Sequence, residues 1–397
     1  MRLLVLAEAL PMSDRASGDL RFLTLLGLLA KRHSVTLCGL NASGQRKRLG
    51  PEAFETYADT LVAHGVTLVE DGLLPLLKNQ VWDGVLFEFY QPARQWLDEV
   101  RFRQPGARIV IDSVDVHFRR FAAKAELTGN EDDRVTAARV RRDELDIYRR
   151  ADAVIVVTED DRRTLQTVLP GLPLLVLPNV HAIFPPIQPA SSVPDSLIFI
   201  GGFQHEPNTD AMLYFCGEVM PLIRRAIPGV RLCIVGSNPP ETIRSLVADS
   251  IEVTGYVPDT APYLAAARIS IAPLRYGAGM KGKIGEAMSH GLPVVTTSVG
   301  AEGFGLTSGE HILLGDSAAD FAEHVIHLLQ DQSLYERIRL AGWEFIRSRY
   351  SLEAVEKLTR TVMAEMATLD VATLPRLKRW RLAARDAYEN NVGWRFH

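Results

Sequence analysis

The chain has 397 residues, of which 47% are hydrophobic and 23% charged, and its formal net charge is −4. This length is too great for one ordinary core and fits two domains of roughly 180 residues each. The acidic balance argues against a nucleic-acid-binding protein, because such a protein needs a basic face.

The three cysteines, Cys38, Cys216 and Cys233, are too widely spaced for a disulfide framework or a zinc site. A reducing compartment is the simplest interpretation, and we expect a cytoplasmic protein. The sequence contains no uninterrupted run of eighteen apolar residues, so it predicts no membrane-spanning helix. Glu8 interrupts the apolar run that begins at Met1 before the run reaches the length of a signal-peptide core. We expect a buried first strand there.

Short apolar runs alternate with amphipathic stretches along the first half of the chain, which is the pattern of a doubly wound parallel sheet. Strands that are buried on both faces read as nearly continuous apolar runs. The expected strands are Arg2–Glu8, Ser34–Leu40, Val66–Asp71, Trp82–Phe87, Ala107–Ile111 and Asp152–Val157. Helices are expected over Gly18–Ala30, Glu52–His64 and Thr136–Arg150.

The alternation pauses at a Pro/Ser-rich stretch that suits neither a helix nor a strand interior, Phe184–Pro194. We therefore expect a first Rossmann-like domain over residues 1–180, a linker over 181–195 and a second Rossmann-like domain over 196–355. The strands expected in the second domain are Ser196–Ile200, Arg231–Val235, Ile251–Val253, Ile269–Ala272 and Pro293–Thr296. The helices of residues 356–397 are expected to pack back on the first domain.

The predicted fold class is thus α/β, with two doubly wound domains that face a central cleft. In such domains ligands bind beyond the carboxyl ends of the strands.

The segment Gly277–Pro293 combines a glycine-rich turn with a helix that is expected over Met280–His290. Backbone N–H groups at the N-terminus of a helix attract phosphate. Lys281 and Lys283 lie in the first turn, which is the unfavourable end of a helix for cations, and this suggests that an anion compensates them. The alternative is an ordinary helix with a surface ion pair between Lys283 and Glu286.

This segment resembles the retaining glycosyltransferases of family 4, which have the GT-B fold. The family carries a Glu-x-seven-Glu element that ends in a Glu-Ala-Met-x-x-Gly-x-Pro-Val-Val run, and Glu286–Val295 matches that run. The resemblance implies that Glu286 holds the ribose hydroxyls of a nucleotide. The chain has Ala278 in place of the first glutamate, as do members with a Gly-x-Gly-x-Lys-x-Lys variant. In that case the resemblance implies that the backbones of Gly279 and Met280 contact the sugar hydroxyls.

Other stretches of the second half resemble the loops that hold the donor in this family. Phe199–Asn208 resembles the first strand–loop–helix unit, whose paired glycines let the backbone approach phosphates. Asn208 itself is better interpreted as a helix N-cap. The expected donor-binding residues are Gly201, Gly202, Gly236, Ser237, Tyr256, Val257, Gly277, Gly279, Met280, Lys281, Lys283 and Glu286.

Two residues are expected to act in catalysis. His117 follows an expected strand at the place where the family often has a histidine in its cleft, and the alternative is a loop histidine that satisfies a carboxylate. Lys283 is expected to stabilise the leaving diphosphate. Asp112 and Asp115 are too few ligands for a metal site, so neither a metal nor another cofactor is expected.

Three residues are expected on the acceptor side. Gly18 opens a helix after a loop that resembles the acceptor loop of the family, and Arg21 is either an acceptor contact or a solvated charge. Glu88 ends an expected strand between aromatic residues, where it either touches a sugar or pairs with an arginine.

Residues 374–385 form a basic, amphipathic stretch. Such a stretch suits an anionic membrane surface, where a lipid-linked acceptor would also lie. The alternative is a terminal helix that packs on the first domain.

The resemblance implies a retaining glycosyltransferase that moves a hexose from a nucleotide-diphosphate sugar to a saccharide or lipid-linked saccharide, in polysaccharide or glycolipid biosynthesis. We expect it to work without a metal. One alternative is a sugar-nucleotide epimerase on the same fold, which would turn over the donor alone. The other is a catalytically silent binding subunit, which donors would stabilise without any transfer.

Overall fold

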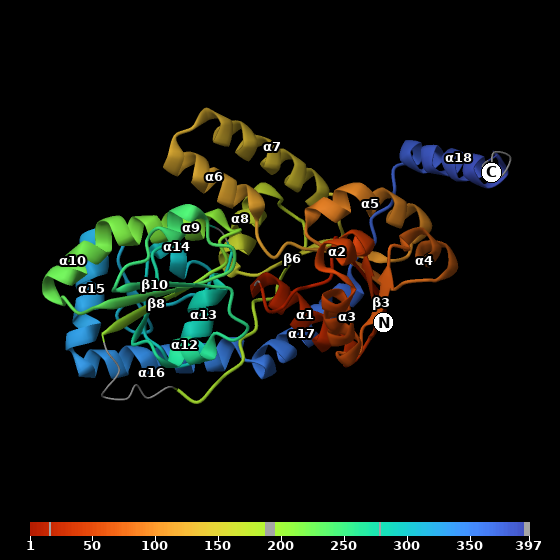
Figure 1. Ribbon diagram of the computed structural model, residues 1–397. Coiled ribbons are helices and arrows are strands. Elements are labelled where there is room, and N and C mark those ends of the chain that lie inside the picture. The colour runs from red at the N-terminus through yellow and green to blue at the C-terminus, as the bar shows by residue number, and fades with distance from the viewer. Residues whose placement is uncertain (16, 187–194, 278, 393–397) are drawn as a thin grey trace.

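A computed structural model describes residues 1–15, 17–186, 195–277 and 279–392. Two parallel α/β domains lie side by side, with the hairpin of α6 and α7 projecting beside their junction (Figure 1). The predicted fold class is confirmed. Ala278 and most of the expected linker lie outside the described residues. Among the described helices, none combines the length and the apolar character that crossing a bilayer requires.

The N-terminal domain is built on a seven-stranded parallel sheet with the order β3-β2-β1-β4-β5-β6-β7. Its strands are β1 (Arg2–Ala7), β2 (Ser34–Gly39), β3 (Thr67–Glu70), β4 (Gly84–Glu88), β5 (Arg108–Asp112), β6 (Ala153–Val156) and β7 (Leu174–Val176). Its helices are α1 (Ser17–Ala30), α2 (Ala42–Leu49), α3 (Pro51–Ala63), α4 (Leu73–Asn79), α5 (Tyr90–Arg103), α6 (His117–Thr128), α7 (Glu131–Tyr148) and α8 (Glu159–Val168). The chain order reverses between β1 and β4, so ligands of this domain are expected near the carboxyl ends of these two strands.

The C-terminal domain is built on a six-stranded parallel sheet with the order β10-β9-β8-β11-β12-β13. Its strands are β8 (Ser196–Ile200), β9 (Arg231–Val235), β10 (Ile251–Gly255), β11 (Ile269–Ala272), β12 (Val294–Thr296) and β13 (Leu313–Leu314). Its helical elements are α9 (Glu206–Tyr214), the π-helix η1 (Phe215–Val219), α10 (Met220–Ala226), α11 (Glu241–Arg244), α12 (Ala261–Ala265), α13 (Gly282–Ser289), α14 (Ser298–Ala301), α15 (Ala318–Gln330) and α16 (Gln332–Tyr350). The switch point between β8 and β11 brings together the loops that follow these two strands.

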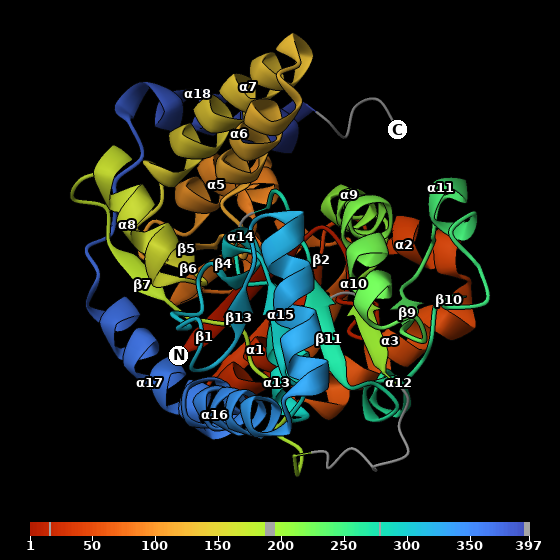
Figure 2. The same ribbon diagram turned by 90° about the vertical axis from the view of Figure 1, so that its left-hand side faces the viewer.

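Beyond α16 the chain returns to the first domain. Helix α17 (Leu352–Thr368) places Val355, Val362 and Met366 in the same core as strand β1. The Met366 side chain reaches β4, where a Cβ on Gly84 would lie 2.5 Å from its terminal methyl carbon. Helix α18 (Arg376–Val392) then lies outside α5, at the end of the first domain that is remote from the second (Figures 1 and 2).

Candidate functional site

The N-termini of two helices, one from each domain, meet at the junction. Helix α13 begins at Gly282, and a Cβ on that glycine would lie 2.5 Å from the Cβ of Ser17, the first residue of α1. Each helix presents the positive end of its dipole and free backbone N–H groups. Because two positive ends lie together, this point favours an anion.

Lys283 reaches the glycine loop that follows β8. Its ammonium group donates a hydrogen bond to Asn208 Oδ1 at 2.5 Å and lies 4.2 Å from the centre of the Phe199 ring. A Cβ on Gly201 would lie 2.8 Å from both Lys283 Nζ and Asn208 Nδ2, so a larger residue here would displace these two side-chain ends. Burial lowers the pKa of Lys283 to about 7, while Glu286 opposes this shift. The charged form is therefore costly unless an anion joins it.

Asn208 is not the helix N-cap that the sequence suggested, because His205 occupies that position and Asn208 lies within the first turn of α9. Its amide nitrogen donates to the Gly202 carbonyl oxygen at 2.7 Å, while its oxygen accepts from Lys283. The side chain thereby joins the loop after β8 to helix α13. Gly236 closes the same loop, since a Cβ there would lie 2.0 Å from the Gly201 carbonyl oxygen.

Glu286 lies one turn beyond Lys283 on α13. The Thr260 hydroxyl donates a hydrogen bond to its carboxylate, and Asp259 lies nearby. Burial raises the pKa of Glu286, although this hydrogen bond and Lys283 oppose the shift. A half-buried carboxylate with remaining acceptor capacity suits a pair of hydroxyl groups.

The loop after β10 holds two further expected donor residues. The hydroxyl of Tyr256 donates to Asp14 Oδ2 at 2.6 Å, across the domain junction, and the Arg15 guanidinium lies 5.9 Å from the centre of its ring. Val257 is half-buried beside it. Ser237, from the loop after β9, donates to Gln204 Oε1 at 3.3 Å.

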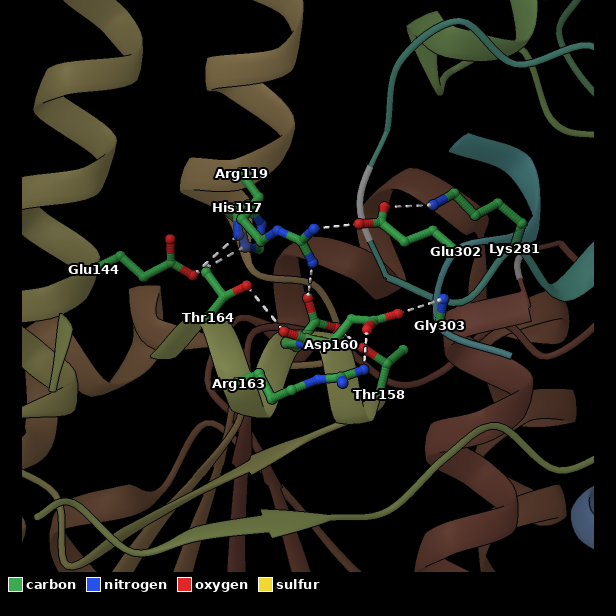
Figure 3. Close-up of polar contacts among 11 residues, drawn as sticks. His117, Arg119, Glu144, Thr158, Asp160, Arg163, Thr164, Lys281, Glu302 and Gly303 are labelled. Atoms are coloured by element: carbon green, nitrogen blue, oxygen red, sulfur yellow. Dashed lines mark hydrogen bonds and ion pairs between the residues drawn. The ribbon is translucent and has the colours of Figure 1, made fainter. Parts of the chain in front are cut away.

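Lys281 does not share the position of Lys283. It is buried, and its ammonium group lies 3.4 Å from Glu302, which also pairs with Arg119 of α6 (Figure 3). Arg119 in turn donates to Asp161 at 2.7 Å. Lys281 thus takes part in an ion-pair network that joins the two domains, and its role in donor binding stays a prediction.

The expected sugar contacts, Gly279 and Met280, are buried at this junction. Gly277 and Gly279 have φ angles of 156° and 67°, which favour glycine. A Cβ on Gly279 would lie 3.3 Å from the Val114 carbonyl oxygen, so the glycine turn meets the loop after β5. Val114 itself has a φ of 45°, an uncommon conformation for a β-branched residue.

His117 opens helix α6 just beyond that loop. The buried Glu144 carboxylate accepts hydrogen bonds from the backbone N–H groups of His117 and Phe118 at 3.0 and 2.8 Å. His117 Nδ1 lies 3.0 Å from the Asp115 carbonyl oxygen, which fixes a proton on Nδ1 and leaves Nε2 as an acceptor. Burial lowers the pKa of His117, so the ring is neutral near pH 7. The alternative role expected for His117, a histidine that satisfies a carboxylate, applies only to its backbone N–H group. The ring is too far away for a hydrogen bond, since Glu144 Oε1 lies 3.8 Å from Nδ1.

Of the three residues expected on the acceptor side, Arg21 is held by an ion pair inside the first domain. Arg21 is buried, forms a two-pronged ion pair with Asp112 at 2.7 and 3.0 Å, and donates to the Leu177 carbonyl oxygen. These contacts support the first domain, and the role of Arg21 as an acceptor contact stays a prediction.

Glu88 and Gly18 lie near the switch point of the first domain. Glu88 ends β4, pairs with Asp112 of β5 in the sheet, and is buried. Burial raises its pKa well above the ordinary value, and Asp19 and Asp112 add to this effect. Gly18, in the first turn of α1, lies beside Val114, whose Cγ1 would be 3.8 Å from a Cβ on the glycine.

Several polar residues around the junction escaped the sequence interpretation. Arg120 of α6 lies 3.3 Å from Asp115 and near His205, and Lys124 pairs with Glu206 at 2.9 Å. Asp115 Oδ1 is buried without a hydrogen-bond partner among the described residues. The only sequence signal was the Arg119-Arg120 pair after His117, because the contacts of Arg120 with His205 and of Lys124 with Glu206 join segments more than 80 residues apart.

Two pockets, of about 700 and 580 Å³, lie elsewhere in the structure: one beside the end of α8 and the strap before α18, the other along α7.

Comparisons with known proteins agree with this geometry. Sucrose-phosphate synthase from Thermosynechococcus elongatus has a TM-score of 0.67 at 16% identity, with 92% of this chain and 100% of that chain covered. Anabaena HepE, solved with UDP-glucose, has a TM-score of 0.63 at 14% identity, and the covered shares are again 92% and 100%. The fold is GT-B.

Part of this GT-B chain also matches a family. Residues 194–331 match the family described as glycosyl transferases group 1, and this segment holds the glycine loop after β8, Lys283 and Glu286. The family match and the GT-B fold support a glycosyltransferase.

Other relatives are longer or less completely covered. TarM from S. aureus has a TM-score of 0.58 at 15% identity, with 74% of this chain and 58% of that chain covered. A Klebsiella pneumoniae protein named "Uncharacterized 44.6 kDa protein in cps region" is 25% identical over 169 residues. These are 40% of this chain and 44% of that protein, so this chain spans less than half of that relative.

Proposed function

We propose that the protein is a retaining glycosyltransferase that moves a hexose from a UDP-sugar to a hydroxyl group of a saccharide or lipid-linked saccharide. The acceptor belongs to polysaccharide or glycolipid biosynthesis, a proposal that the cps region in the name of the Klebsiella pneumoniae relative supports. Uridine is chosen because HepE and TarM were solved with UDP or UDP-glucose. We place the reaction in the cytoplasm.

One observation carries the proposal: the N-termini of α1 and α13 meet beside the ammonium group of Lys283. A diphosphate in this position would accept hydrogen bonds from the free N–H groups of both helices. It would also pair with Lys283, whose charge has no carboxylate partner within ion-pair distance among the described residues. The same groups would stabilise the negative charge that develops as the diphosphate leaves the sugar.

The nucleoside end of the donor fits α13 and the loop after β10. Glu286 would accept hydrogen bonds from two ribose hydroxyls, held in place by Thr260. The base would lie against the backbone near Ser237, Tyr256 and Val257. Contacts to the backbone recognise the shape of a base and only weakly its identity.

The sugar and the acceptor fit the side of the junction formed by the first domain. His117 Nε2 is available to accept a hydrogen bond from a sugar hydroxyl, since its other nitrogen is occupied. The buried carboxyl group of Glu88, whose pKa burial raises, is proposed to bind the acceptor together with Gly18. Retention follows from attack of the acceptor hydroxyl on the face from which the diphosphate departs.

The test is a thermal-shift panel of UDP-, GDP- and ADP-sugars, followed by product analysis with and without acceptors. We expect stabilisation by UDP-sugars and consumption of the donor only when an acceptor saccharide is present. Conversion of the donor alone to an isomer would identify an epimerase instead. Stabilisation without transfer to a broad acceptor panel would identify a binding subunit.

A further inference from the structure

Helix α18 is held on the first domain by charges. Lys378 pairs with Asp98 of α5 at 2.9 Å, and Arg103 of α5 pairs with Asp386 at 2.7 Å. Arg385 pairs with Glu99, which also belongs to α5. These contacts fix which face of α18 looks toward the protein.

The outward face of α18 is apolar and aromatic. Leu377, Trp380 and Tyr388 are 63%, 69% and 64% exposed, three of the large hydrophobic side chains most exposed in the described chain. With Ala384 they recur at intervals of three and four residues, so they form one stripe along the helix. The exposure of such an apolar stripe to water is unfavourable, and contiguous exposed apolar surface of this kind marks an interaction site.

Basic residues flank this stripe. Arg376 and Arg381 lie on its two sides, and Arg379 is also exposed. The only acidic residue between 376 and 388 is Asp386, which is paired with Arg103 of α5. The outward face therefore combines Trp, Tyr and Leu with arginine and without a described carboxylate.

This chemistry favours a lipid surface over another protein copy. Aromatic and aliphatic side chains enter the boundary between headgroups and acyl chains, and arginines pair with anionic headgroups. A second copy of α18 on the stripe would place arginines against arginines.

We propose that the Leu377–Trp380–Tyr388 face of α18 binds the surface of a membrane that contains anionic lipids. Helix α18 would lie in the plane of the membrane–water interface, since no described helix is suited to cross a bilayer. The first domain is thereby held at the membrane surface. This inference does not depend on the proposed transfer reaction.

The experiment is flotation of the full-length protein with vesicles of phosphatidylcholine, alone or mixed with phosphatidylglycerol. We expect at least about tenfold stronger binding to the mixed vesicles, with most of the difference lost in high salt. Leu377→Ala/Trp380→Ala should lower that binding by about tenfold or more. Arg376→Gln/Arg379→Gln/Arg381→Gln should remove its salt-sensitive part.

Matched controls replace side chains of similar exposure on other elements. Val135→Ala on α7 removes an exposed apolar group, and Arg134→Gln/Arg142→Gln/Arg163→Gln removes three exposed charges from α7 and α8. Both controls should float like the wild type.

Equal binding by the wild type and by Leu377→Ala/Trp380→Ala, with unchanged thermal unfolding, would overturn the proposal. So would a dimer, seen by analytical ultracentrifugation, that dissociates on the same substitution while no vesicles are bound. That result would show that a second copy covers the face.

Discussion

The ammonium group of Lys283, on α13, donates a hydrogen bond to the side-chain oxygen of Asn208, on α9. Asn208 carries no charge, so this contact positions the ammonium group without neutralising it. With its pKa lowered to about 7 by burial, Lys283 loses its proton as the pH rises through neutrality.

We therefore expect UDP affinity to fall as the pH rises from 6 to 9. A bound diphosphate favours the ammonium form, so binding above pH 7 should be accompanied by uptake of up to about one proton. Calorimetry in buffers of different ionisation enthalpy measures this uptake. It should vanish in Lys283→Met and persist in Lys31→Met, a control at an exposed surface ion pair. Uptake that persists in Lys283→Met would assign the proton to another group.

Glu286 is expected to set nucleotide affinity through the ribose. Glu286→Gln keeps the size of the side chain and removes the charged acceptor, which should cost about 1.5–3 kcal/mol of UDP binding. Calorimetry with UDP checks this value, and Glu252→Gln, at an exposed position of β10, is the control. Unchanged UDP affinity in a folded Glu286→Gln protein would favour the alternative, in which Glu286 only pairs with Lys283 on an ordinary helix.

His117 is expected to act on the sugar and not on the nucleotide. His117→Ala should lower kcat by about 10²-fold or more while UDP affinity stays at the wild-type value. His327→Ala, at an exposed position of α15, serves as the control and should change neither. If His117→Ala lowers the UDP affinity as much as it lowers kcat, the histidine supports the fold of the junction instead.

The buried pair of Arg21 and Asp112 is expected to support the first domain. Asp112→Asn leaves the Arg21 guanidinium buried without a countercharge, which should lower the free energy of unfolding by about 3–5 kcal/mol. Urea denaturation measures the loss. Arg21→Met/Asp112→Leu, which removes both charges, should recover much of it, and no recovery would mean that the pair contributes more than mutual neutralisation.

Much of the fold could be predicted because strands buried on both faces leave long apolar runs. The strands over Ser196–Ile200 and Arg231–Val235 were expected with the bounds that the structure has. Strands β7 and β13 were missed because two or three residues are too few to show a period. Helix α13 begins two residues later than expected, since Lys281 is at its N-cap.

The site was harder to predict because its chemistry depends on pairs that are remote in sequence. Nothing local distinguishes Lys281 from Lys283, yet Glu302 neutralises the first and Asn208 positions the second. In the sequence, Arg21 resembles an ordinary surface charge. Its partner Asp112, at the end of β5, is 91 residues away along the chain. A family motif therefore predicts where the donor binds, while the three-dimensional structure shows how the contacts of the two lysines differ.

The central claim is that fixed positive groups of the protein, and not a divalent metal, hold the leaving diphosphate. The measurement that tests it most directly is the rate of sugar transfer from a UDP-sugar to an acceptor saccharide in excess EDTA. We expect wild-type transfer to persist there, with Lys283→Ala lowering the rate by roughly 10²–10³-fold and Lys31→Ala leaving it unchanged. Complete loss of transfer on chelation, restored by Mn²⁺, would contradict the account.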